Sequence, residues 1–524
     1  MNRFLTRANK KLSLGSAATL LAGASLLGII LGVLRTKLIN ANFVNFESDA
    51  YFAAFKIPDF VFFTLASGAL GVAFLPILSE KLQKSRQSAW DVASYILNAL
   101  AFVGFFAALL IIIFAEPLIK YIVAPGFTPE QLHLSVAIMR IVSVNIFLFS
   151  ISTVLTTVQQ ATGRFFFFAV APLFYNGAII ASIYIFGEKY GIVGLSLGVA
   201  LGAILQLLVV ALGMVGLNFR YRPYIDFKNK SFREVLRILP ARSIDQGIDN
   251  INSIVETRFA SHLSIGSVTN YENALVLYNA PVMLIGNAIS TAAFPRLTTR
   301  LAQGRVDLFR KEFIRVLRTM IWIALPVVVV SYFARGYLAR IIFARGNNVI
   351  ALIFGFLCIA IFFRIIYTLM SRYFYAHKDT KTPLYVSIFA IFLNIILAYN
   401  LSKPTAYGVS GLALAQSIVA ATEVFLLVAV IVKRDRHLFN RAFLSSLGKT
   451  LSVTGFSAFA AFITVQFFQL NANDTGFVLL LNLTIIASVT FIVHTAVSYL
   501  FELEEAKIVV ERVRRFALRP VKLD

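Results

Sequence analysis

Four polar side chains stand out because they lie within one apolar stretch of the chain, residues 237–262. They recur at spacings of four, three and four, which is the repeat of one face of an α-helix. They are Asp245, Asp249, Asn252 and Glu256. A carboxylate inside a bilayer is costly unless it is hydrated, protonated or paired. Three carboxylates on one face therefore indicate water or cations beside that face. In the alternative interpretation, Arg242 and Arg258 neutralise them at the ends of the stretch.

Cationic side chains interrupt other apolar stretches. They are Arg35, Lys56, Arg140 and Arg364. A guanidinium is suited to a phosphate or pyrophosphate, because it can donate two parallel hydrogen bonds. Any one of these cations could instead neutralise a carboxylate of residues 237–262. Two amides, Asn176 and Asn394, also lie in apolar stretches, and for Asn176 an interhelical hydrogen bond is the favoured interpretation.

The elements that must hold these residues are membrane helices. Of the 524 residues, 59% are hydrophobic and only 14% are charged, a balance typical of a polytopic membrane protein. The net charge of +23 does not indicate nucleic acid, because the basic residues lie between the apolar stretches, as in cytoplasmic loops. The single cysteine, Cys358, excludes an intrachain disulfide.

No motif of an enzyme is present. The chain has no GxxxxGK[ST] phosphate loop, no HExxH motif and no paired cysteines. We therefore expect a protein that is not an enzyme and that carries no organic cofactor.

The hydropathy pattern predicts an all-α protein of about fourteen transmembrane helices. The predicted spans are 14–38, 49–79, 91–114, 132–158, 165–187, 191–217, 237–262, 272–297, 311–333, 350–372, 382–401, 406–432, 446–469 and 477–501. An even number of spans places both termini on one side, and the distribution of Lys and Arg makes that side cytoplasmic.

An internal repeat divides these spans. Three segments recur in the same order and at a nearly constant offset along the chain. FLPILSEKL, ending at Leu82, matches AFPRLTTRL, ending at Leu301; AEPLIKYIVAPG (115–126) matches ARGYLARIIFARG (334–346); and YGIVGLSLG (190–198) matches YGVSGLALA (407–415). Because each half has six spans, the repeats are parallel, and a cavity between them would open alternately to either side.

The repeat predicts two pseudo-symmetric six-helix lobes followed by two further helices. The expected divisions are an N-lobe at 1–217 with a basic cytoplasmic N-terminus, a basic cytoplasmic linker at 218–236, a C-lobe at 237–432, two additional spans at 433–501, and a basic amphipathic cytoplasmic tail at 502–524.

Five motifs give the chain a family resemblance. They are SDAYFAAFKIP (48–58), GALGVAFLPIL (68–78), APGF (124–127), RFFFFAVAPLFYN (164–176) and FYAHKDTKTP (374–383). With them the chain resembles the MurJ (MviN) family of lipid II flippases, within the multidrug/oligosaccharidyl-lipid/polysaccharide exporter superfamily. The resemblance implies two six-helix lobes, two extra helices that form a groove for a lipid tail, and movement of a lipid-linked peptidoglycan precursor from the inner to the outer leaflet.

The resemblance also implies site residues, with departures. Three arginines of the family's cationic cluster fall on Ile29, Phe62 and near Val276, while Arg35 and the outer-end Asp49 are retained. Some family members are thought to hold a sodium ion between spans 7, 11 and 12. Glu256 and Asn394 match two positions of that site, but its second span 11 carboxylate falls on Ala398.

The resulting hypothesis is a flippase for a polyprenyl-pyrophosphate-linked precursor, working by alternating access and coupled to a cation or to the membrane potential. The substrate-binding candidates in the central cavity are Arg35, Asp49, Lys56, Asp245, Asp249 and Asn252, and the candidates for cation coupling, with sodium as the candidate metal, are Glu256 and Asn394. The expected partners are the lipid-linked glycan, membrane lipids and cell-wall synthesis proteins in a bacterial cytoplasmic membrane. The alternatives are an exporter of another lipid-linked oligosaccharide and a scaffold that does not transport.

Overall fold

The structure is a computed structural model. It describes residues 9, 11, 14–343, 347–471, 473–507 and 510–511, and the side chains of residues 14, 15, 18, 66–73 and 238–249 lie outside this description. Across these residues the regular secondary structure is helical, without a strand. The predicted tail falls largely on residues 512–524, which are not among those described.

The helices match the predicted spans. Within the described chain, twelve helical segments are long and apolar enough to cross a membrane, and they coincide with all predicted spans except the second and the seventh. Those two spans are also helical, at Asn45–Lys84 and Lys230–Ser261, and they are the two that carry the most charged side chains. The prediction of an all-α polytopic protein with about fourteen spans is confirmed.

The chain forms two compact units, Met1–Thr269 (unit 1) and Asn270–Asp524 (unit 2). The helices described in unit 1 are α2 (Leu14–Asn42), α3 (Asn45–Phe62), the π-helical turn η1 (Phe63–Ser67), α4 (Gly68–Lys84), α5 (Arg86–Pro117), the π-helical turn η2 (Leu118–Val123), α6 (Pro129–Val142), α7 (Val144–Ala161), α8 (Phe166–Ile185), α9 (Gly187–Leu212) and α10 (Lys230–Ser261).

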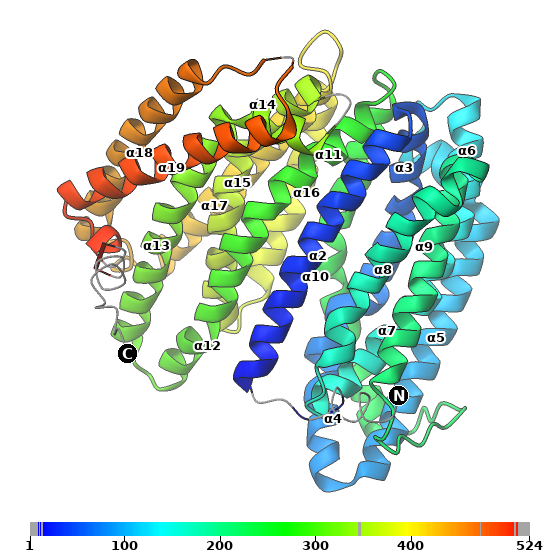
Figure 1. Cartoon of the computed structure of the whole chain (residues 1–524). Coiled ribbons are helices and arrows are strands. Elements are labelled where there is room, and N and C mark those ends of the chain that lie inside the picture. The colour runs from blue at the N-terminus through cyan, green and yellow to red at the C-terminus, as the bar shows by residue number, and fades with distance from the viewer. Residues whose placement is uncertain are drawn as a thin grey trace, which may run out of the picture. The chain divides into compact units, whose positions relative to one another are not determined.

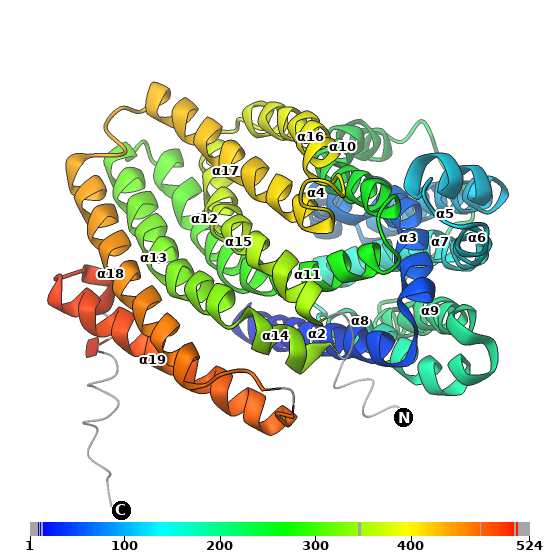
Figure 2. The ribbon, with the colours of Figure 1, turned by 90° about the horizontal axis from the view of Figure 1, so that it is seen from above.

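Unit 1 is built around paired helices. α8 and α9 run side by side, α2 packs against α8, and α3 packs against α6 (Figures 1 and 2). α10 packs against α3, η1 and α4, so the helix with the polar stripe belongs to this unit. The main buried cluster draws on α2, α3, α6 and α9, for example through Ile39, Tyr51, Met139 and Val199. Burial of these side chains fixes the positions of α2 and α3, which carry Arg35 and Lys56.

Unit 2 holds α11 (Ser267–Pro281), whose first turn contains the boundary, the π-helical turn η3 (Val282–Asn287), α12 (Ala288–Ala302), α13 (Val306–Phe333), α14 (Arg335–Ile342), α15 (Asn347–Ala376), α16 (Lys381–Leu401), α17 (Val409–Arg434), α18 (Arg441–Phe467) and α19 (Gly476–Leu500). α15 packs against α13 and α17, and α18 pairs with α19 (Figure 1). The chain after α19 folds back onto α13, where Arg318 forms ion pairs with Glu504 and Glu505.

The backbone repeats its irregularities at the offset that the sequence predicts. The π-helical turn at Phe63–Ser67 recurs at Val282–Asn287, the same offset that separates Leu82 from Leu301. Helices break at Phe114 and at Ala334, both with φ −95° and ψ 15°, at nearly that offset again. A π-helical turn inserts an extra residue and re-aims the helix that follows. The two halves therefore share bends as well as sequence.

The compact units and the predicted lobes divide the chain differently. The repeat starts its second half at residue 237, whereas the packing of α10 places residues up to Thr269 with unit 1. The units are defined by contacts between helices, whereas the lobes are defined by the internal sequence repeat. The lobe boundaries stay a prediction.

Candidate functional site

Arg35 lies between two helices of unit 1. Its Nη1 donates to the Asn176 Oδ1 at 3.1 Å, which joins α2 to α8, and the Asn176 Nδ2 donates to the carbonyl oxygen of Pro172. The interhelical role expected for Asn176 is therefore present. A neutral amide leaves the positive charge of the guanidinium in place, so Arg35 retains the electrostatic character that an anionic group would need.

Aromatic side chains pack near the partner of Arg35. Tyr51 belongs to the main buried cluster of unit 1, and Tyr175, next to Asn176 in α8, packs against that cluster. The Tyr175 ring contacts that of Phe149 at 5.4 Å, and Phe149 in turn contacts Phe62 at 5.4 Å. The aromatic ring of Phe62 thus packs where the family resemblance leads one to expect an arginine. The sequence analysis did not single out Tyr51 or Tyr175, because tyrosines within apolar stretches are ordinary.

Lys56 reaches the polar stripe of α10. It is 9% exposed, and its Nζ donates to the Ser253 Oγ at 2.7 Å. Ser253 follows Asn252 and precedes Glu256 by three residues, so Lys56 meets α10 within one turn of both predicted site residues. Asn252 is half-buried, and Glu256 is buried. The structure therefore brings the lysine of span 2 and the stripe of span 7 together.

Asp49 is held by donors of Gly266 and of the first turn of α11. Its carboxylate accepts hydrogen bonds from the Gly266 N–H at 2.6 Å, from the Thr269 N–H at 2.7 Å and from the Thr269 hydroxyl at 2.7 Å. It is 2% exposed. In this conformation the carboxylate caps the start of a helix, an arrangement that stabilises both groups. Its assignment to substrate binding stays a prediction.

Asp245 and Asp249 lie within α10, which runs without a break from Lys230 to Ser261. Their side chains fall outside the described part of the structure. The helical backbone that the four-residue spacing requires is present, and the roles of both carboxylates stay predictions.

Asn394, predicted to share a sodium site with Glu256, belongs to unit 2. It is buried on α16, at 2% exposure. Carboxylate and amide oxygens are ligands that hard cations accept. Over the described residues, no group of three or more His, Cys, Asp or Glu side chains gathers as a metal site would. A sodium ion at Glu256 and Asn394 stays a prediction.

The sequence analysis missed one partner of Arg364. In unit 2 the Arg364 Nη1 lies 3.2 Å from the Glu423 Oε2, which joins α15 to α17. The Glu423 side chain is 7% exposed, and the guanidinium also lies over the Tyr367 ring at 5.0 Å. Arg364 therefore forms an ion pair with a carboxylate of span 12. A single Glu in an otherwise apolar span was the signal that could have found the pair.

Comparison with known proteins shows the family of this chain. The family model described as lipid II flippase MurJ matches residues 40–492. The chain belongs to the MurJ family. The family consists of transporters rather than enzymes, and together with the twelve apolar helices it identifies a multi-pass membrane protein.

Curated relatives cover most of the chain. A probable lipid II flippase MurJ from Borreliella burgdorferi is 26% identical over 459 residues, which are 86% of this chain and 88% of the relative. Probable lipid II flippases from Buchnera aphidicola of Acyrthosiphon pisum and from Thermotoga maritima are 28% and 26% identical, over 71% and 80% of this chain and 75% and 86% of their own lengths.

Solved structures agree on the fold. A lipid II flippase MurJ in an inward closed conformation matches with a TM-score of 0.76 and 23% identity, over 92% of this chain and 99% of that one. An inward-facing multidrug resistance MATE transporter of the MOP superfamily matches with a TM-score of 0.66 and 15% identity, over 78% of this chain and 95% of its own. At these identities the match concerns the fold alone.

Proposed function

We propose that this protein moves a polyprenyl-pyrophosphate-linked peptidoglycan precursor, lipid II, from the inner to the outer leaflet of a bacterial cytoplasmic membrane. The observation that carries the proposal is the family match across residues 40–492, which spans both sequence repeats. The polar groups inside unit 1 support it, since Arg35 and Lys56 are cations placed within apolar helices. Such cations are costly in a membrane and are generally retained for function.

The mechanism in this proposal is alternating access. Arg35 and Lys56 meet the pyrophosphate, Asp49, Asp245, Asp249 and Asn252 complete the polar surface, and Glu256 with Asn394 binds the coupling cation. Pyrophosphate recognition draws on the guanidinium of Arg35, whose contact to Asn176 leaves its charge uncompensated by that partner. Both termini lie in the cytoplasm, as the positive-inside rule predicts, and membrane lipids and cell-wall synthesis proteins are the expected partners.

A second function is favoured by one specific observation. At three places where the family resemblance leads one to expect arginine, this chain has Ile29, Phe62 and Val276, and Phe62 takes part in an aromatic contact with Phe149. Fewer cations would suit a headgroup with less negative charge. The second candidate is therefore an exporter of another lipid-linked oligosaccharide of the same superfamily.

Transport in vesicles tests both candidates. Vesicles that contain only this protein receive fluorescent lipid II in one leaflet, and its appearance in the other leaflet is followed by an added enzyme or quencher that acts on one side. Movement of lipid II supports the first function. Movement of another polyprenyl-linked oligosaccharide, but not of lipid II, supports the second. Movement of neither substrate by correctly inserted protein leaves a scaffold that does not transport.

A coupling variant tests the cation assignment separately. Glu256→Gln removes a buried charge with little change of shape. We expect transport by this variant to lose its dependence on the cation gradient. If Glu256→Gln shows the same gradient dependence as the unaltered protein, the coupling assignment is wrong, while the flippase assignment is unaffected.

A further inference from the structure

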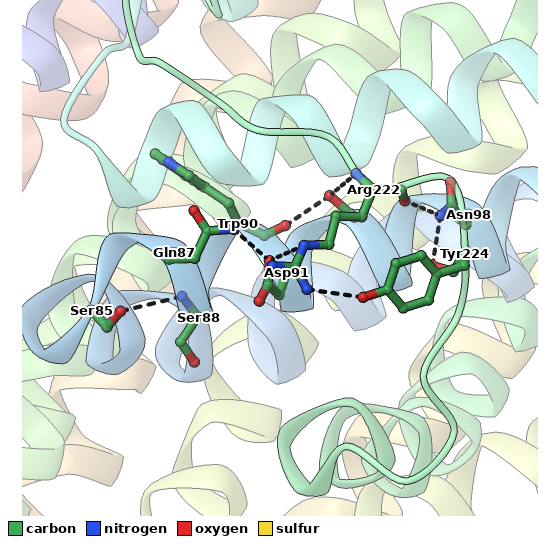
Figure 3. Close-up of polar contacts among 9 residues, drawn as sticks. Ser85, Gln87, Ser88, Trp90, Asp91, Asn98, Arg222 and Tyr224 are labelled. Carbon is green, nitrogen blue, oxygen red and sulfur yellow. Dashed lines mark hydrogen bonds and ion pairs between the residues drawn. The ribbon is translucent and has the colours of Figure 1, made fainter.

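The linker at residues 218–236, which leads from α9 into the first two turns of α10, is fixed to the N-terminal half of α5. The Asn98 Nδ2 donates to the carbonyl oxygens of Arg222 and Tyr224 at 2.7 and 2.9 Å, and the Asn98 Oδ1 accepts from the Tyr221 hydroxyl at 2.7 Å. The Arg222 Nε lies 2.9 Å from the Asp91 Oδ1, and its Nη1 donates to the Tyr224 hydroxyl (Figure 3). The linker therefore holds a defined shape along α5.

The α5 residues that bond the linker lie just before the part of α5 whose exposed side chains are hydrophobic. α5, all of whose residues are described, has 32 residues and is therefore about 48 Å long, which exceeds the roughly 30 Å of a hydrocarbon core. Its exposed large hydrophobic side chains begin at Phe102 and continue to Phe114. Asn98 precedes Phe102 by one helical turn. The linker is thus fixed at the level where the membrane-facing surface of α5 begins.

Three exposed aromatic side chains project from the linker at this level. Tyr221, Tyr224 and Phe227 are 52%, 50% and 68% exposed. They form one patch, because Tyr221 and Tyr224 share the partner Asn98, and Tyr95 of α5 contacts both Tyr224 and Phe232, which in turn contacts Phe227. Exposed aromatic rings of this kind gather at membrane–water interfaces, where their apolar bodies enter the headgroup region.

The same segment is basic. Of its charged residues, Arg220, Arg222, Lys228, Lys230 and Arg233 are positive, and Asp226 and Glu234 are negative. Arg220, Lys228, Lys230 and Arg233 are exposed. Lysines and arginines next to a membrane span are attracted to anionic lipid headgroups. Aromatic rings and basic side chains together favour an anionic lipid surface over water as the neighbour of this patch.

We propose that the linker is an interfacial anchor that binds anionic phospholipid headgroups. Phe227, Tyr221 and Tyr224 enter the headgroup region, and Lys228, Lys230 and Arg220 meet the phosphates. Because the linker is also bonded to α5, the anchor holds the α9–α10 connection at the membrane surface. This inference does not depend on the proposed transport function, since it concerns only the lipid contact of the linker.

A fluorescent label at the tip of the patch tests the proposal. Cys358 is buried, so Phe227→Cys offers one accessible thiol for bimane on the full-length protein. The labelled protein is placed in vesicles of phosphatidylcholine alone or with phosphatidylglycerol, and quenching by brominated lipid is compared with quenching by aqueous iodide. We expect phosphatidylglycerol to raise quenching by brominated lipid about twofold, and about 0.5 M salt to remove the increase.

Matched charge variants sharpen the test. Lys228→Gln with Lys230→Gln should remove the effect of phosphatidylglycerol. Lys189→Gln with Lys403→Gln removes the same charge from two exposed lysines outside the linker and should leave the effect unchanged. The proposal is overturned if iodide quenches the label equally in every lipid composition, or if the linker variant responds to phosphatidylglycerol as the control variant does.

Discussion

In unit 1 the guanidinium of Arg35 faces the neutral amide of Asn176, whereas in unit 2 the guanidinium of Arg364 faces the carboxylate of Glu423. The two units nevertheless bend at matching places, at η1 and η3 and at Phe114 and Ala334. A cation that faces an amide keeps its charge for an anion, while one that faces a carboxylate is neutralised. We infer that unit 1 binds the anionic headgroup and that the ion pair of unit 2 is structural.

The largest expected effect comes from breaking the ion pair of unit 2. Glu423→Ala removes a buried carboxylate that pairs with the Arg364 guanidinium among apolar helices, and loss of one partner of a buried pair costs about 3 kcal/mol. We expect a corresponding drop in the free energy of unfolding, measured in detergent by thermal or denaturant unfolding.

Two controls accompany this variant. The double variant Arg364→Leu with Glu423→Leu should recover most of the lost stability, because both charges of this pair are removed together. Glu80→Ala removes an exposed partner of Lys84 and should leave the stability nearly unchanged, because water screens the pair. A stable Glu423→Ala protein that no longer transports would show that the pair is functional, contrary to our inference.

The second prediction concerns backbone that the two units share. Gly191 and Gly408 have φ of 58° and 54° with ψ of −146° and −137°, a region that side chains rarely adopt. Neither position is crowded enough for a new methyl group to clash, since the nearest atom at Gly191 is 3.5 Å away and Gly408 has none within 4 Å. Gly191→Ala and Gly408→Ala should each lower the free energy of unfolding by about 2 kcal/mol.

The two units are compared through these two variants, because Gly191→Ala and Gly408→Ala are expected to lower the free energy of unfolding by the same amount. Both are measured by the same unfolding assay. If one glycine substitution is silent and the other severe, the shared backbone does not reflect a shared mechanical role in the two halves.

The third prediction separates transport from stability in unit 1. Arg35→Ala removes a half-buried cation whose partner is neutral, so we expect transport to fall about tenfold, which corresponds to about 1.4 kcal/mol, while the free energy of unfolding changes by less than about 1 kcal/mol. Vesicle transport and unfolding are measured on the same preparations. Arg140→Ala, which removes a guanidinium that donates to the carbonyl oxygen of Ile112, serves as the matched control.

A different outcome would contradict the comparison. If Arg35→Ala transports normally, the headgroup is recognised elsewhere. If Arg35→Ala unfolds as readily as Glu423→Ala, the two guanidinium groups have the same structural role despite their different partners.

Sequence patterns predicted the helices well and the contacts of their polar residues less well. The predicted spans and the repeat follow from hydropathy and from matching segments. In the described chain, twelve of the spans are apolar helices, the other two are helical, and the π-helical turns recur at the offset of the repeat. The partner of a polar residue depends on how helices pack, which periodicity does not encode. For Arg364 an anion or a span 7 carboxylate was predicted, and its contact with Glu423, 59 residues further along the chain, was not foreseen.

The π-helical turns also escaped the sequence analysis. Pro58 and Pro281 precede η1 and η3, but a proline alone does not specify whether a helix kinks, ends or gains a residue. For Asp49 the residue was identified, but not its capping contacts with Gly266 and Thr269, which lie 217 and 220 positions further along the chain. Such contacts follow from the tertiary structure.

The smallest expected effect concerns contacts between a loop and the C-terminal end of a helix, at α9 in unit 1 and at α17 in unit 2. In unit 1 the Arg164 guanidinium of the loop before α8 donates to the carbonyl oxygens of Gly213, Val215 and Gly216, beyond the end of α9. In unit 2 Arg434, at the end of α17, lies 2.7 Å from the Asp379 carboxylate of the loop before α16. Only the second contact includes a group that titrates in acid.

Partial burial raises the pKa of Asp379, but hydrogen bonds from Thr382 and from Arg434 outweigh it and hold the pKa at about 2. The carboxylate therefore contributes stability above its ordinary pKa of 3.8, and this contribution is lost as the pH falls from about 4 towards 2. Asp379→Asn should lower the free energy of unfolding by less than about 1 kcal/mol at neutral pH, and the difference should vanish in acid. Arg164→Gln, measured alongside, should show a difference that does not depend on pH, because its acceptors are carbonyl oxygens; equal pH dependence of the two variants would mean that Asp379 is not the group that titrates.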